Sequence, residues 1–175
     1  MKGLREFEIP YVGLKVGVHR FKYDIDADFF KHFKDSPIND CKVTVNLDFE
    51  KKETFFILNF FIDGDVHVEC DRCLAPFRKA IFGDYTCYVK FADEPNKMDE
   101  EPDVMYISRD ESIIDISHLV YEYVILCLPM QQIGCEKPGQ EPQCNQETLK
   151  FLNNDTTTEN NESDPRWDVL KKLKN

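Results

Sequence analysis

The feature that most constrains the fold is a stretch of alternating side chains in the first half of the sequence. Between residues 41 and 49, apolar residues occupy every second position and mostly polar residues stand between them. Successive side chains of a β-strand point to opposite faces of a sheet, so this spacing predicts a strand with one buried face. The stretch from 53 to 62 is apolar on both faces, which is typical of a central strand.

The same region predicts the turns that join these strands. Asp63-Gly64 favours a tight turn into a further strand that ends at Cys70, and residues 74–77 favour a second turn. The chain is then expected to return through an alternating stretch that ends at Phe91. Together these segments predict an antiparallel meander of about four strands. Further short strands are expected at 4–10, 15–24 and 104–107.

A helix is predicted from Asp115 to Leu128. Its apolar residues recur with helical spacing, so one face of the helix must be buried. Asp115 can accept hydrogen bonds from the first-turn amides, and Pro129 cannot continue the hydrogen-bond ladder. Shorter helices are expected at 26–33, where three phenylalanines have helical spacing behind an acidic start, and near 146–152.

These elements predict an α+β fold with an antiparallel curved sheet, or a partly closed barrel, covered by a few helices. We expect one domain over residues 1–152. The tract 153–163 has no apolar side chain to bury and predicts a flexible linker. Residues 164–175 then predict a C-terminal amphipathic helix, with Pro165 at its start and lysines near its end.

Charge and cysteine content narrow the function classes. The formal net charge of −11 argues against a protein whose whole surface neutralises phosphates, so any RNA contact must be local or made through a protein partner. Residues 1–19 lack the apolar core of an export signal, and seven cysteines without one favour the reducing cytosol. No apolar run is long enough to cross a bilayer. We find no phosphate loop, nucleophile elbow or metal-hydrolase spacing, so we expect a binding factor and not an enzyme.

The sharpest local motif is Cys70-Asp-Arg-Cys73. Two cysteines at this spacing can bind one tetrahedral zinc ion, and Cys135 and Cys144 are the candidates to complete a four-cysteine structural site. The alternative is that Cys70 continues an inward row of strand residues as a small buried hydrophobe, as we expect for Cys41, Cys87 and Cys127. A thioredoxin-like redox role is disfavoured, because the flanking sequence predicts strands and no helix.

Basic and aromatic residues cluster around the same turn. Arg72, Phe77, Arg78 and Lys79 could form a small contact surface for a partner. The competing interpretation is an ordinarily charged hairpin turn.

Three segments stand out in order and spacing: VECDRCLAPF at 68–77, DISHLVYEYVILCLPM at 115–130, and DPRW at 164–167 followed by LKKL at 170–173. Together they resemble the YceD family. The sequence departs from a common family pattern after Met130, where many members carry closely spaced cysteine pairs and this chain has only Cys135 and Cys144.

The resemblance implies a cytoplasmic bacterial factor linked to accumulation of large-subunit ribosomal RNA, with a ribosomal protein or a precursor of that RNA as partner and no role in DNA or membrane binding. Besides the turn residues, Glu122, Arg166 and Trp167 are candidate partner contacts. The tethered C-terminal helix either docks into a partner groove with Trp167 as its anchor or folds back on its own domain, and both interpretations stay open. Two alternatives remain open: a magnesium-dependent RNA-processing enzyme, motivated by the many acidic residues, and a purely structural zinc module.

Overall fold

The computed structural model describes residues 4–93, 101–134 and 145–153. It contains two short 3-10 turns (Leu4–Phe7 and Tyr11–Gly13), the strands β1 (Glu8–Ile9), β2 (Gly17–Asp26), β3 (Cys41–Lys51), β4 (Phe55–Glu69), β5 (Pro76–Ala92), β6 (Val104–Ser108) and β7 (Ile114–Asp115), and the helices α1 (Ala27–Phe30), α2 (Ser117–Leu126) and α3 (Gln146–Asn153).

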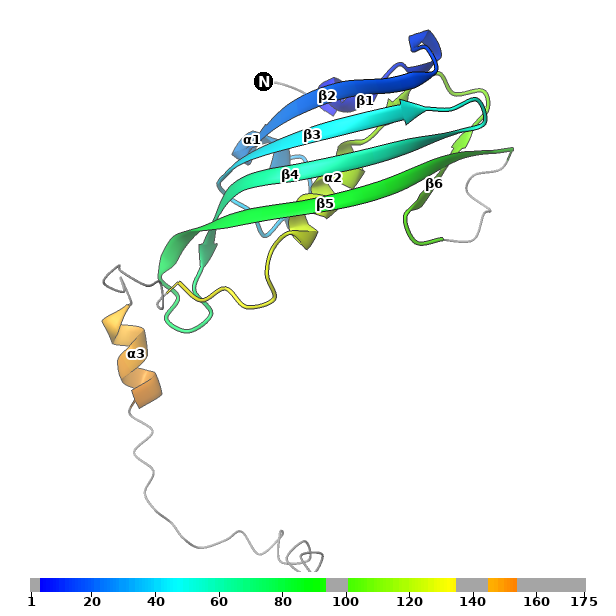
Figure 1. Ribbon diagram of the computed structural model, residues 1–175. Coiled ribbons are helices and arrows are strands. Elements are labelled where there is room, and N and C mark those ends of the chain that lie inside the picture. Colours follow the sequence, from blue (N-terminus) through cyan, green and yellow to red (C-terminus); the bar gives the residue numbers. More distant parts are fainter. Residues whose placement is uncertain (1–3, 94–100, 135–144, 154–175) are drawn as a thin grey trace, which may run out of the picture.

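Five strands form one curved sheet in the order β2-β3-β4-β5-β6 (Figure 1). Strands β2 to β5 are an antiparallel meander, as expected. Strand β6 runs parallel to β5, from Val104 opposite Tyr88 to Ser108 opposite Ala92, so the sheet is mixed and the expectation of an entirely antiparallel sheet is wrong at this edge. The physical reason is that β5 and β6 are joined by a long connection, which does not impose the antiparallel pairing of a tight hairpin. The sheet does not close into a barrel: in the described chain, β2 and β6 are its two edges.

The tight turn expected at Asp63-Gly64 does not exist. Strand β4 runs unbroken through both residues, and Val43 of β3 lies opposite Gly64. A Cβ atom at Gly64 would lie 2.4 Å from the carbonyl oxygen of Lys42 and 2.6 Å from the Cα of Val43. The glycine therefore allows two strands to approach closely, which is the other common reason for a glycine within a strand. Two strands expected at 53–62 and 66–70 are consequently one.

The two faces of the sheet differ in what covers them. In Figure 1, α2, α1 and β1 lie behind the sheet, and no described element crosses its front face. We call the covered side the inner face and the bare side the outer face. On β3 every second residue from Cys41 to Phe49 is 5% exposed or less, which confirms the predicted alternation. The buried face of α2 is also confirmed: Ile116, Val120 and Val124 are fully buried against the inner face.

The N-terminal segment packs on the inner side of the sheet. The strand expected at 4–10 shrinks to the two residues of β1, which pair with β7, because a 3-10 turn occupies the preceding residues. The amide of Ile116 donates to the carbonyl oxygen of Phe7 at 3.1 Å, so this segment also holds the start of α2. The predicted cap of α1 is confirmed, since the side chain of Asp26 accepts from Asp28 N. Asp115 accepts from Ser117 N in the first turn of α2, as predicted, although Ile116 occupies the N-cap position.

The last described element is α3, which confirms the helix expected near 146–152. Its Phe151 side chain is 81% exposed. Asn153, where the linker was expected to begin, is the last residue of α3, so the prediction is wrong at that residue. The rest of the expected linker, 154–163, and the helix expected at 164–175 lie outside the described residues. Over the residues that the structure describes, no helix combines the length and the apolar character needed to span a membrane.

Candidate functional site

The Cys70–Cys73 motif forms a tight turn between the two longest strands of the sheet. Strand β4 ends at Glu69 and β5 begins at Pro76. The amide of Leu74 donates to the carbonyl oxygen of Cys70 at 2.8 Å, and the amide of Cys70 donates to that of Ala75 at 3.0 Å. Leu74 has a φ of 57°, a left-handed conformation that costs a side chain with a Cβ roughly 1 kcal/mol or more. The turn therefore holds a strained residue in place with backbone hydrogen bonds.

The two sulfurs of the motif lie inside the protein. Cys70 is 1% exposed and Cys73 is fully buried, although the turn stands at the far end of a hairpin. The amide of Gly134 donates to the Sγ of Cys70 at 3.5 Å. Amide groups that point at sulfur favour the negatively charged thiolate, which is also the form that binds metal. The sequence interpretation of Cys70 as a buried residue is confirmed, and the ligand interpretation stays a prediction.

The chain after α2 covers the cysteine turn through hydrogen bonds. The amide of Asp71 donates to the carbonyl oxygen of Gln132 at 2.9 Å, and the amide of Gln132 donates to Oδ2 of Asp71 at 2.6 Å. Gly134 then lies against the ring of Phe77, where an added Cβ would come within 2.7 Å of the ring's Cγ. We call this arrangement of residues 70–77 with 132–134 the cysteine-turn region. It joins two segments that are far apart in the sequence.

Sequence reasoning did not identify residues 132–134 as part of this site. The one available signal was Gly134, which directly precedes Cys135 in the sequence. A glycine next to a candidate ligand is common where backbone must approach closely, but it does not say which partner it approaches.

The basic residues predicted around the turn do not form one surface. Along β5 the side chains alternate, so Phe77 and Lys79 point to the inner side and Arg78 to the outer side. Arg78 is held there by ion pairs with Asp65 and, at 3.0 Å, with Asp40. Arg72 is exposed on the turn itself. A partner contact by these residues stays a prediction, and it would have to wrap around the end of the hairpin.

The other predicted site residues are spread over the chain. Glu122 is exposed on α2. Cys135, Cys144, Arg166 and Trp167 lie outside the described residues, so the four-cysteine site and the tryptophan anchor stay predictions. Within the described ranges, no group of three histidine, cysteine, aspartate or glutamate side chains gathers as a metal site would require.

Two further cysteines are part of the core, as expected. Cys41 and Cys87 are 5% and 1% exposed and belong to the cluster under the inner face. Burial raises the pKa of Cys41 to about 12 and that of Cys87 to about 11. At neutral pH both thiols stay protonated, which makes them poor nucleophiles and poor metal ligands. Cys127 is only half-buried; it packs on the same cluster and its thiol contacts the Tyr85 hydroxyl at 3.8 Å.

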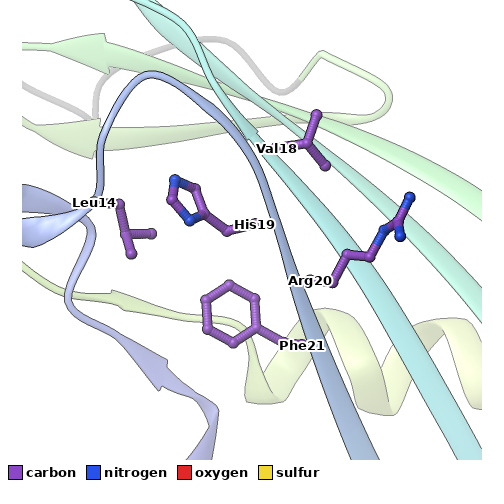
Figure 2. Close-up of a pocket in the computed structure, with 5 residues that line it drawn as sticks. All are labelled: Leu14, Val18, His19, Arg20 and Phe21. Carbon is purple, nitrogen blue, oxygen red and sulfur yellow. The ribbon is translucent and has the colours of Figure 1, made fainter.

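An open depression lies beside the start of β2. It is lined by Leu14, Val18, His19, Arg20 and Phe21. In Figure 2, His19 and Phe21 project to one side of β2, and Val18 and Arg20 project to the other. The ring of His19 is hydrogen-bonded to the carbonyl oxygen of Lys15 at 2.8 Å, and Arg20 pairs with Asp48. The polar groups therefore do not converge on a common ligand position, as they do in most ligand sites.

A comparison with known protein families covers the cysteine-turn region. Residues 58–174 match the family described as large ribosomal RNA subunit accumulation protein YceD. The chain belongs to the YceD family. The match starts within β4 and includes the cysteine turn and α2, which confirms the resemblance found in the sequence motifs, while β1, β2, α1 and β3 precede it. No curated protein and no solved structure matches the chain.

Proposed function

We propose that this YceD-family chain supports the accumulation of large-subunit ribosomal RNA as a non-catalytic cytoplasmic binding factor. The observation that carries the proposal is the family match over residues 58–174, whose description names this role. The fold is compatible with it, because the described residues form a sheet whose longest hairpin ends in a buried, hydrogen-bonded turn. The two sulfurs of this turn are buried, so they are not presented to solvent as nucleophiles.

Gradient fractionation of cell extract tests this role. The protein is expected to migrate with immature large ribosomal subunits, and its removal is expected to lower the amount of large-subunit RNA relative to small-subunit RNA. A protein found only at the top of the gradient would contradict the proposal. Magnesium-dependent cleavage of precursor RNA by the pure protein, lost in a carboxylate variant, would replace it with an enzymatic function.

Zinc is the cofactor that we propose for the cysteine-turn region. Cys70 and Cys73 supply two sulfurs on one turn, and an amide already points at one of them. Cys135 follows Gly134 directly in the sequence, and Cys144 completes the proposed set. Bound zinc would supply a cross-link between the β4–β5 turn and the chain after α2, where it would stabilise folding and take no part in catalysis.

Metal analysis of protein purified without chelator tests the zinc site. We expect about one zinc per chain, lost in the double variant Cys70→Ser with Cys73→Ser. The matched control is Cys127→Ser, which changes a half-buried cysteine outside the turn and should keep its metal. Zinc-free wild-type protein, or equal zinc in the double variant, would exclude this site.

A further inference from the structure

The outer face of the sheet presents two phenylalanines and two aspartates as a square. Phe61 of β4 lies opposite Asp84 of β5, and Asp63 of β4 lies opposite Phe82 of β5. All four side chains point to the same face, because positions two apart on a strand share a face. The two rings therefore occupy one diagonal of the square and the two carboxylates occupy the other. We call these four residues the aromatic-acidic patch.

The rings of this patch are exposed to solvent. Phe82 is 82% exposed and Phe61 is 43% exposed, while Tyr88 extends the row along β5 at 42%. No described element covers this face of the sheet (Figure 1). Exposed apolar side chains that cluster on one face commonly mark a site of interaction. The chain thus keeps large rings in water at the centre of a sheet, where polar residues would serve folding equally well.

The charge around the rings is negative. No lysine or arginine of the described ranges forms an ion pair with Asp63 or Asp84, whereas the outer-face cations Arg20 and Arg78 are each paired with a carboxylate. Lys42, the nearest lysine by register, stands opposite Asp65. Two carboxylates next to two aromatic rings form an environment that attracts a cation and repels a phosphate.

We propose that the aromatic-acidic patch binds a lysine- and arginine-rich segment of a protein. Guanidinium and ammonium groups can stack on the faces of Phe61 and Phe82 while they pair with Asp63 and Asp84. The charge complementarity favours a basic polypeptide over RNA, which would meet two uncompensated carboxylates. The assignment rests on the proposed function, since a factor of net charge −11 can reach ribosomal RNA through the basic proteins bound to it.

Binding of a labelled peptide of alternating arginine and leucine to the full-length protein tests the patch. We expect Phe82→Ala, and separately Asp63→Asn with Asp84→Asn, to weaken binding at least about fivefold, as loss of a central anchor does. Phe151→Ala is the matched control for the ring, because Phe151 is 81% exposed on α3. Glu53→Gln with Asp110→Asn is the control for charge, because both residues are exposed away from the patch. The controls should change affinity less than about twofold.

Three outcomes overturn the assignment: wild-type protein that does not bind the peptide, equal weakening in the patch variants and the controls, and tight binding of single-stranded RNA that the patch variants lose. Thermal unfolding of each variant, expected to be unchanged, separates loss of binding from loss of structure. Gradient fractionation of the same proteins distinguishes the two proposals. If wild-type protein migrates with immature large subunits without binding the peptide, only the patch assignment fails. If it binds the peptide through the patch but stays at the top of the gradient, the patch stands and the proposed function fails.

Discussion

The two faces of one sheet show how neighbouring residues of similar chemistry can serve different ends. Phe60 and Phe61 are adjacent in β4, yet Phe60 is completely buried and Phe61 is 43% exposed. The ring of Phe60 packs 5.1 Å from that of Tyr123 in α2, while Phe61 stands beside carboxylates on the bare side. Burial of the inner-face side chains holds the fold together. The outer-face side chains can therefore form a surface that contributes little to stability.

The largest expected effect is on the pair Phe60 and Phe61. Phe60→Ala removes a ring from a fully packed position and should lower the free energy of unfolding by about 3–5 kcal/mol. Phe61→Ala should change it by less than about 1 kcal/mol, because much of that ring is already in water. Urea denaturation of both variants measures the difference. Equal losses of unfolding free energy in the two variants would contradict this difference between the two faces.

A smaller effect is expected where the inner face has no room for a side chain. Gly64→Ala places a Cβ within 2.4 Å of a backbone oxygen of β3, which cannot rotate away, and should cost about 2 kcal/mol. Asp63→Ala, one residue earlier and on the outer face, serves as the control and should stay within about 0.5 kcal/mol of wild type. Denaturant midpoints of the two variants give the comparison. A neutral Gly64→Ala would mean that β3 and β4 are not held this closely.

An effect of similar size to that of Gly64→Ala is expected from a change in pH. Burial raises the pKa of Cys87 from its ordinary value of 9.0 to about 11, because the thiolate is disfavoured on the inner face. The folded protein thus retains this proton more tightly than the unfolded chain. Its contribution to stability is complete below pH 9 and is lost as the pH rises toward 11, by an amount on the order of 2 kcal/mol.

Denaturation curves at pH 7, 9 and 11 measure this loss, and Cys87→Ala is the control that should show a weaker alkaline decline. The pKa of Cys41 is raised in the same way, so some decline persists in that variant. A stability that is constant up to pH 11 would show that the inner-face thiols reach solvent.

The sequence predicted those parts of the fold that local periodicity determines. Alternation fixed the faces of β3, and helical spacing together with Asp115 fixed the buried side and the start of α2. The strand predicted to end at Cys70 and the turn predicted at 74–77 also located the end of the hairpin. In each case the relevant forces act between residues close in sequence.

The rest depends on contacts between distant segments. Asp63-Gly64 has the composition of a turn, and only the approach of β3 shows why the strand continues through it. The apolar residues on both faces of 53–62 suggested burial on both sides, but the outer face is bare, so part of that apolar character belongs to the aromatic-acidic patch. The direction of β6 and the contact of Gly134 with Cys70 are likewise set by tertiary packing, which leaves no periodic signature.

The pairing of β1 with β7 has a consequence for the order in which the molecule assembles. Glu8 lies opposite Asp115, so two-residue strands from near the beginning and from the second half of the described chain must meet across the segments that form the sheet. During synthesis the first partner leaves the ribosome early and the second one late. Closure across so long a loop raises the contact order and slows folding. We therefore expect docking of the N-terminal segment to be the last kinetic step, completed only after α2 has been translated.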